Sequence, residues 1–211
     1  LNIIDAEIGY RILPKTTLLF EGYLGFLDYD SPLSSDSYYI ETLLGLRGDL
    51  TSKLTVNLSG GLRHQDYESS DLTGSDDFTS FVARGGVDYY ITDDDILNLS
   101  LERSIYESTY ANMNYYNVNL ISARYTHMFN NKISAGLFGS YQLNLYPGKS
   151  TEDGKTAKRY DHIFGTGCMV RYDIRKWISV ELKYECLQRE SRFSTFDYID
   201  NLITIRGTVG F

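Results

Sequence analysis

The 211-residue sequence has little of what marks several common classes of protein. It contains two cysteines, three histidines, three prolines and one tryptophan. It has no run of about 18 apolar residues, which excludes a membrane-spanning helix. Basic residues are outnumbered by acidic ones, 20 to 28, and the net charge of -8 argues against nucleic acid as a partner. The scarcity of proline leaves long segments free to form unbroken strands.

The two cysteines, Cys168 and Cys186, are not expected to form a disulfide. Pairing of two consecutive predicted strands across the turn at 174–176 would set Cys168 opposite Leu182, leaving Cys186 about four residues further along. At roughly 3.4 Å per residue the separation is about 13 Å, which a disulfide cannot bridge. We interpret both residues as part of an apolar, lipid-facing surface.

Alternation of apolar and polar residues is the main positive signal, and it is clearest at the end of the chain. Ile203, Ile205, Val209 and Phe211 share one parity, and polar residues separate most of them. An alternating segment with a terminal aromatic residue is typical of the closing strand of an outer-membrane β-barrel. We predict that Ile205, Val209 and Phe211 form the signal for insertion into the outer membrane.

The same alternation recurs along the whole chain and predicts about eleven strands. They cover residues 3–12, 16–28, 37–50, 53–67, 78–91, 95–108, 115–129, 132–145, 159–173, 177–190 and 199–211. Most are longer than the 5 to 6 residues typical of globular strands and long enough to cross a bilayer at a tilt. Nineteen tyrosines suit aromatic girdles at the membrane interfaces. The predicted fold is all-β, an antiparallel up-and-down transmembrane β-barrel.

Short and long connections alternate along the chain and give it a direction. Short turns are predicted at 14–15, 51–52, 92–94, 130–131 and 175–176, and longer polar connections at 29–36, 68–77, 109–114, 146–158 and 191–198. Short turns of bacterial barrels face the periplasm and long loops face outward. We therefore expect extracellular long loops, some with acidic clusters such as Asp71, Asp76 and Asp77, and a periplasmic carboxy-terminus.

An odd number of strands conflicts with this direction. Counting back from a periplasmic Phe211 through eleven strands places Leu1 outside the cell, and single-chain bacterial barrels have an even number of strands. We expect residues 1–211 to form a single barrel domain that lacks at least one amino-terminal strand. Upstream strands or a second chain would complete it.

Parity also divides the side chains into a lipid-facing set and a charged inner set, because charge on the lipid face is costly. The lipid-facing set includes Leu44, Val56, Leu62, Leu101 and Leu137. The proposed pore-lining residues are Glu21, Tyr23, Glu41, Arg47, Arg63, Arg84, Asp88, Glu102, Arg171, Glu181, Lys183 and Glu185. Arg103 and the segment 115–129 do not fit their parity, and we expect a β-bulge in each.

Two interpretations of the charged inner face remain open at this point. The charges could line a hydrated conduit for a polar solute, since charged rings impose selectivity in a pore. They could equally neutralise one another across neighbouring strands without transporting anything.

The sequence offers little support for catalysis or for a metal or cofactor. His64, His127 and His162 are scattered and lack the nucleophile or carboxylate pattern of a hydrolase. We expect no enzyme activity, no cofactor and no metal site. The acidic stretch 71–77 lacks the ligand spacing of a calcium loop and is interpreted as a solvated loop.

Several segments together resemble the bacterial outer-membrane proteins grouped as β-barrel porin type 2. The resembling segments are 20–23 (FEGY), 28–30 (DYD), 44–55 (LGLRGDLTSKLT), 60–63 (GGLR), 66–67 (DY), 101–104 (LERS) and 107–108 (ES). The resemblance implies a longer barrel than this chain can form and an association with exopolysaccharide export. It brings no catalytic residue with it.

The leading hypothesis is an outer-membrane conduit for a secreted polysaccharide or another polar solute, in which Tyr23, Tyr39 and Tyr90 stack on sugar rings. Its expected partners are outer-membrane lipid and lipopolysaccharide, the barrel-assembly machinery, and either periplasmic export components or a second chain. One alternative is a non-transporting barrel that anchors a surface assembly. A soluble β-sandwich or lipocalin-like protein is a third.

Overall fold

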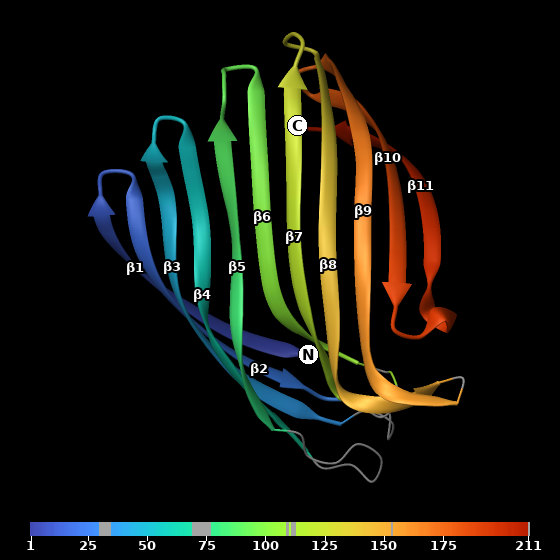
Figure 1. The fold of residues 1–211 in the computed structure, drawn as a ribbon. Coiled ribbons are helices and arrows are strands. Elements are labelled where there is room, and N and C mark those ends of the chain that lie inside the picture. Colours follow the sequence, from blue (N-terminus) through green and yellow to red (C-terminus); the bar gives the residue numbers. More distant parts are fainter. Residues whose placement is uncertain (30–34, 69–76, 109, 111–112, 153, 211) are drawn as a thin grey trace.

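The computed structural model describes residues 1–29, 35–68, 77–108, 110, 113–152 and 154–210. In this part of the chain a single antiparallel sheet of eleven strands runs in chain order, so each strand pairs with its sequence neighbours (Figure 1). The strands are β1 (Asn2–Leu13), β2 (Thr16–Leu27), β3 (Ser37–Thr51), β4 (Leu54–Tyr67), β5 (Phe78–Tyr90), β6 (Asp95–Glu107), β7 (Tyr115–Met128), β8 (Ile133–Glu152), β9 (Lys155–Arg175), β10 (Ile178–Ser191) and β11 (Tyr198–Val209). One short 3-10 helix, η1 (Ser194–Phe196), precedes β11. No helix within the described residues is long and apolar enough to cross a membrane.

Five tight turns lie at one end of the curved sheet, and the remaining connections lie at the other end (Figure 1). Two to four residues separate β1 from β2, β3 from β4, β5 from β6, β7 from β8 and β9 from β10. β1 starts at the long-loop end and β11 finishes at the tight-turn end. The five predicted tight turns are confirmed, but the predicted long connection 146–158 is wrong, because only two residues separate β8 from β9. Residues 69–76, with Asp71 and Asp76, and Phe211 lie outside the described part.

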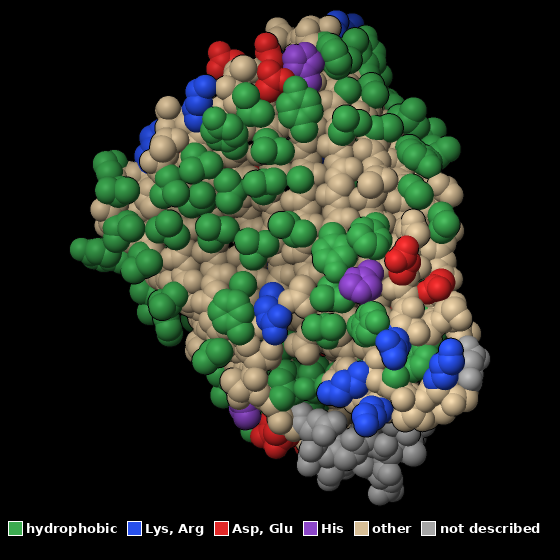
Figure 2. Space-filling view, viewed as in Figure 1, with side chains coloured by type: hydrophobic (Ala, Val, Ile, Leu, Met, Phe, Trp, Pro, Cys, Tyr) green, Lys and Arg blue, Asp and Glu red, His purple; other side chains and the backbone are tan. Residues whose placement is uncertain are grey.

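The two faces of the sheet differ sharply in chemistry. On the outer face Leu44, Leu62, Leu137 and Ile205 are 64%, 54%, 65% and 75% exposed, and Figure 2 shows hydrophobic side chains spread over this face. A soluble protein would bury such aliphatic rows, and contiguous exposed rows mark contact with another apolar phase. No second sheet covers them in the described chain, which argues against a soluble sandwich. Val56 shares this face but is only 3% exposed.

Two observed strands are longer than the sequence predicted. β8 and β9 continue past their expected ends at 145 and 159 and pair as far as Glu152↔Lys155, so most of the expected loop 146–158 is strand. The misleading residue was Pro147, which cannot donate to a ladder and is usually confined to bulges or edges. It lies in the register shift between Leu145 and Lys149, after which the pairing resumes.

The tip of the β6–β7 hairpin leaves the wall of the sheet. β5 pairs with β6 only up to Ala83↔Arg103, whereas β6 pairs with β7 as far as Glu107↔Tyr115. Neither pairing contains a register shift, so the predicted β-bulges are wrong. Arg103 lies where the strands part, and its Nε donates to the carbonyl oxygen of Phe81 at 3.1 Å. Arg103, a charged residue at a position where alternation predicts an apolar one, therefore marks the end of the β5–β6 pairing. Beyond it, the Arg103 side chain donates to a backbone carbonyl of β5 that β6 no longer reaches.

The two cysteines form no disulfide, as predicted, but the pairing of β9 with β10 differs by two residues from the predicted one. Cys168 lies opposite Tyr184, two residues from the Leu182 predicted, and Cys186 lies opposite Thr166. Both cysteines are free.

The first and last strands form the edges of the sheet. Among the described residues β1 pairs only with β2, and β11 only with β10. Every residue of β1 is exposed, as is all of β11 but one.

Candidate functional site: the inner face and the inserted hairpin tip

Strand register places all twelve proposed pore-lining residues on one face of the sheet. Directly paired residues share a face, so pairs such as Glu41↔Arg63 and Arg84↔Glu102 carry the assignment from strand to strand. Glu21, Glu41 and Arg63 are buried there, at 6%, 5% and 9% exposed. This is the inner face, because the opposite parity carries the exposed aliphatic rows.

The hairpin tip packs one of its sides against the inner face of β3–β5. Ile105 forms a buried cluster with Leu43 and Val82. Tyr115 stacks on Phe78 with ring centroids 3.9 Å apart. These contacts hold the end of β6–β7 inside the curve of the sheet.

A buried polar network joins the same side of the tip to β4. Gln65, which is fully buried, donates from Nε2 to Oε1 of Glu107 at 2.7 Å. The Tyr67 hydroxyl also contacts this carboxylate, at 3.1 Å from each oxygen. Two buried donors thus converge on Glu107, and they anchor the tip to β4.

The other side of the tip contacts the extended β8–β9 hairpin. Tyr116 stacks on Tyr106 and on Tyr146, with centroids 5.9 and 5.0 Å apart. Beyond β6, the Tyr110 hydroxyl lies 2.9 Å from Ser150 Oγ and 3.0 Å from Glu152 Oε1. Burial and, to a lesser extent, the hydrogen bond to Glu152 raise the pKa of Tyr110, and the hydrogen bond with Ser150 lowers it by less than burial raises it. The tip is thus held from both sides of the curved sheet.

Arg159 and Asp161 form the best-buried ion pair of the described chain. Their side chains are 5% and 0% exposed, and Arg159 Nη2 lies 2.7 Å from Asp161 Oδ2. The Arg159 guanidinium also lies 3.7 Å from the ring centroid of Phe196 and 4.5 Å from that of Tyr110. This pair links the β8–β9 hairpin to both η1 and the tip.

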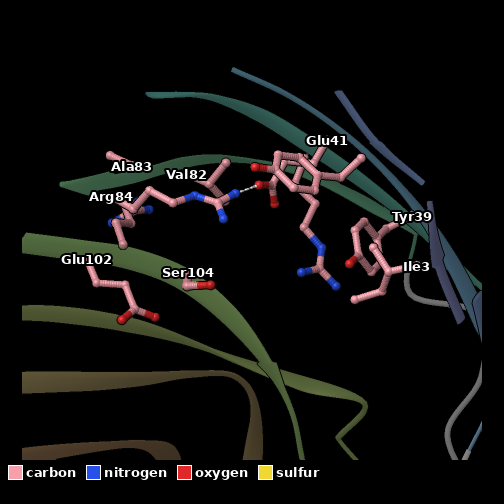
Figure 3. A pocket seen from close by; sticks show the side chains of 11 residues that line it. Ile3, Tyr39, Glu41, Val82, Ala83, Arg84, Glu102 and Ser104 are labelled. Atoms are coloured by element: carbon pink, nitrogen blue, oxygen red, sulfur yellow. Dashed lines mark hydrogen bonds and ion pairs between the residues drawn. The ribbon is translucent and has the colours of Figure 1, made fainter. Parts of the chain in front are cut away.

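Two arginines lie over tyrosine rings on the inner face of β2–β5. Arg63 lies 3.7 Å from the Tyr39 ring centroid, and Arg84 lies 4.8 Å from that of Tyr23 and forms an ion pair with Glu41. Figure 3 shows the side chains around the adjoining cavity, with the Arg84–Glu41 contact dashed. The cavity has a volume of about 380 Å³.

The predicted stacking of sugar rings does not fit Tyr39. One face of its ring carries Arg63, and the ring lies so close to Gly25 that a Cβ atom there would overlap it. Tyr39 therefore holds an arginine in place. Tyr23 likewise carries Arg84 on one face, whereas Tyr90 remains 39% exposed.

The remaining predicted residues mostly contact a partner of opposite charge or a hydrogen-bonding neighbour. The contacts are Arg47–Glu7 at 2.6 Å, Asp88–Asn98 at 2.7 Å, Glu102–Tyr106 at 2.9 Å, Arg171–Asp173 at 3.0 Å, Lys183–Glu185 at 2.7 Å and Glu181–Arg206 at 3.8 Å. Such pairs agree with mutual neutralisation, and they leave both interpretations of the inner face open.

Sequence reasoning missed the residues that anchor the tip, above all Glu107 and Gln65. Glu107 has the parity of the outer leucines of β6 and becomes internal only because the tip leaves the wall. The misplaced charge of Arg103 was the one available signal.

The three histidines lie on the outer face, and each has one polar side-chain partner. His127 contacts Asp95 at 2.8 Å, His64 contacts Thr79 at 3.0 Å and His162 contacts Tyr141 at 2.8 Å. No group of three His, Cys, Asp or Glu side chains suited to a metal occurs among the described residues.

Comparison with known proteins decides the family. Residues 3–210 match the family described as "Putative beta-barrel porin 2". The chain belongs to this family. The family supports an outer-membrane location for this porin-family chain.

Solved structures agree on the fold. A loop-deletion mutant of OmpT, an outer membrane protein of Vibrio cholerae, matches with a TM-score of 0.56 and 14% identity over 97% of this chain and 62% of that one. A mutant of the TodX monoaromatic hydrocarbon channel matches with a TM-score of 0.50 and 11% identity over 99% of this chain and 73% of that one. The chain thus spans less than two thirds of the Vibrio protein. No curated protein matches.

Proposed function

We propose that this porin-family chain forms an outer-membrane channel for polar solutes, and that the solute it serves is a secreted polysaccharide. The observation that carries the proposal is the inner face: it bears Arg63, Glu41 and Arg84 around a cavity, while the outer face is aliphatic. Closely spaced arginines and carboxylates offer hydrogen-bond donors and acceptors to hydroxyl groups. The proposal includes the expected orientation, with long loops outside and the tight turns in the periplasm, and the absence of catalysis.

The inserted tip gives this channel a constriction. It is held by Leu43 and Val82 on one side and by Tyr146 on the other, so a solute has to pass beside it. The passage past β2–β5 contains the two arginine–tyrosine pairs. Selectivity would then be set by this short region and not by the whole lumen.

Channel activity is tested by ion conductance of the purified protein in planar lipid bilayers. Arg84→Glu places a third carboxylate beside Glu41 and Glu102 and should increase cation selectivity at the constriction. Arg171→Glu, at an exposed ion pair far from the tip, should change selectivity less. Conductance and selectivity unaffected by either reversal would instead favour mutual neutralisation.

The polysaccharide is tested in cells. Loss of the gene should lower the amount of polysaccharide at the cell surface, and the gene carrying Arg84→Glu should restore it only partly. Unchanged surface polysaccharide in the deletion strain would remove polysaccharide export from the proposal while leaving the channel intact.

A second candidate, a barrel that transports nothing, is favoured by the aromatic packing of the tip. Tyr67, Phe78 and Tyr115 on one side and Tyr106, Tyr116 and Tyr146 on the other fill space that a channel would leave open. Such a barrel would anchor a surface assembly through its long loops. Absence of conductance in bilayers that contain correctly folded protein would support it.

The two edge strands bear on how the barrel closes. Unpaired backbone groups in hydrocarbon cost several kcal/mol each, so open edges do not persist in a bilayer. We propose that β1 and β11 pair with further β-structure, from upstream strands or a second chain. Hydrogen exchange of the full-length protein in liposomes tests this, because edge amides that are covered exchange slowly. Rapid exchange of every second amide of β1 would contradict it.

A further inference from the structure

Arg63 is a buried cation that forms no ion pair with a carboxylate of the described residues. The residue is 9% exposed, and its Nε atom is buried without a hydrogen-bond partner. Its Nη2 atom donates to the neutral amide oxygen of Gln65 at 2.6 Å. Among the described residues no carboxylate forms an ion pair with it, unlike Arg84, Arg47 and Arg159. Burying an arginine without a counter-ion is costly, and the cost falls when an anion binds.

The carboxylates of Glu41 and Glu107, which lie on the same side of the sheet as Arg63, contact other residues. Glu41 pairs with Arg84, and Glu107 accepts hydrogen bonds from Gln65 and Tyr67. Arg63 itself is held in position by the Tyr39 ring, which in turn lies against Gly25. The Tyr39 ring thus supports the guanidinium from one side.

Arg63 and Tyr39 lie between two cavities. The cavity of about 380 Å³ also contains Glu41, Glu102 and Ser104, and a second cavity of about 400 Å³ extends towards Asp28 and Tyr29 at the long-loop end. Both volumes are in the range of small-molecule sites. The two cavities lie beside the inserted tip, on the side where a solute would pass in the proposed channel.

We propose that Arg63 binds the carboxylate of an acidic sugar residue as it passes the tip. Glu41, Glu102 and Ser104 would accept or exchange hydrogen bonds with the sugar hydroxyls. A monoanion suits the site better than a doubly charged phosphate, because Glu41 and Glu107 contribute negative charge close by. This inference rests on the proposed channel, and it narrows the polysaccharide to one that contains uronic acids.

The test is block of ion current by sugars in planar bilayers that contain the full-length protein. Trigalacturonate should interrupt the wild-type current at a concentration at least about tenfold lower than maltotriose, a neutral trisaccharide, since tenfold corresponds to a modest charge-assisted contact. Arg63→Gln should remove this preference, and Arg63→Lys should retain part of it. Arg192→Gln is the matched control, since Arg192 also lies over a tyrosine, Tyr160, but outside the lumen. Equal block by both sugars in the wild type, or an unchanged preference in Arg63→Gln, would overturn the inference.

Binding measured separately distinguishes failure of the site from failure of the channel. Calorimetric titration of trigalacturonate into folded protein in detergent should show binding to the wild type and at least about tenfold weaker binding to Arg63→Gln. If the protein binds but conducts no ions, the site stands and the channel falls. If it conducts ions but binds no trigalacturonate, the channel stands and the site falls. Should Arg63→Gln fail to fold, Tyr39→Leu, which keeps the charge but removes its support, should weaken binding in the same direction, and unaltered binding in that variant would count against the site.

Discussion

Arg159 and Asp161 occupy alternate positions of β9 and form an ion pair that is almost completely buried. Asp161 also accepts a hydrogen bond from the Ser191 hydroxyl at 2.6 Å, so its carboxylate has partners on both β9 and β10. β9 contains a second ion pair of this kind, between Arg171 and Asp173, whose members are also two residues apart in sequence. Both of these side chains are 40% or more exposed. One strand thus carries a buried pair and an exposed pair of equal sequence geometry.

This duplication allows a controlled test of what burial contributes. Arg159→Ala leaves the Asp161 carboxylate buried with its main partner removed, and we expect a loss of about 3–5 kcal/mol of unfolding free energy. Arg171→Ala should cost under about 1 kcal/mol, because an exposed pair is screened by water. Urea unfolding of the protein folded into liposomes measures both. Equal losses would show that the region around Arg159 is hydrated in the membrane.

Glu107→Gln tests the anchoring of the inserted tip. The amide replaces one accepting oxygen by a donor that faces Gln65 Nε2 and the Tyr67 hydroxyl, and a mismatched buried hydrogen bond costs about 1–3 kcal/mol. We expect faster hydrogen exchange at Ile105 and Tyr115 and larger fluctuations of single-channel current. Glu185→Gln, which changes a carboxylate on the wall beside Lys183, should leave exchange in the tip unaltered. Unaltered exchange in Glu107→Gln would mean that apolar contacts alone hold the tip.

Much of the fold followed from alternation alone, because the side-chain period of a strand is two and one face had to be apolar. The strands, the tight turns and the inner position of residues such as Glu41 and Arg171 needed no knowledge of distant contacts. The tip was different. The pairing of β6 with β7 continues without a register shift through Glu107, and what changes there is the other neighbour, since β5 parts from β6 after Arg103. The side chains beyond Arg103 move from the wall of the sheet to its interior, but the two-residue period of the strand stays the same. Such a change leaves almost no trace in the sequence. Which arginine pairs with which carboxylate was equally hidden, since many pairings satisfy the same pattern.

Gly25→Ala tests the support of Tyr39 and, through it, of Arg63. An added Cβ would overlap the Tyr39 ring, so ring and guanidinium have to move, and overpacking of this kind costs about 1–3 kcal/mol. We expect lower stability in liposomes and an altered conductance. Gly22→Ala on the same strand is the control, because nothing lies within 4 Å of a Cβ atom there. Equal stability of the two variants would show that Tyr39 has room to move.

Leu101→Arg and Ser100→Arg test the assignment of the two faces with neighbouring residues. Leu101 is 43% exposed on the outer face, whereas Ser100 shares the inner parity and its hydroxyl lies 2.6 Å from that of Ser122. An arginine facing lipid costs about 2–4 kcal/mol at the bilayer midplane and less towards the interfaces, whereas a lumen-facing arginine stays hydrated. Leu101→Arg should therefore lower the unfolding free energy in liposomes much more than Ser100→Arg. In detergent micelles, which deform easily around a charge, the gap between the two variants should narrow. A larger loss for Ser100→Arg would reverse the inner and outer faces, and with them every residue assigned to the lumen.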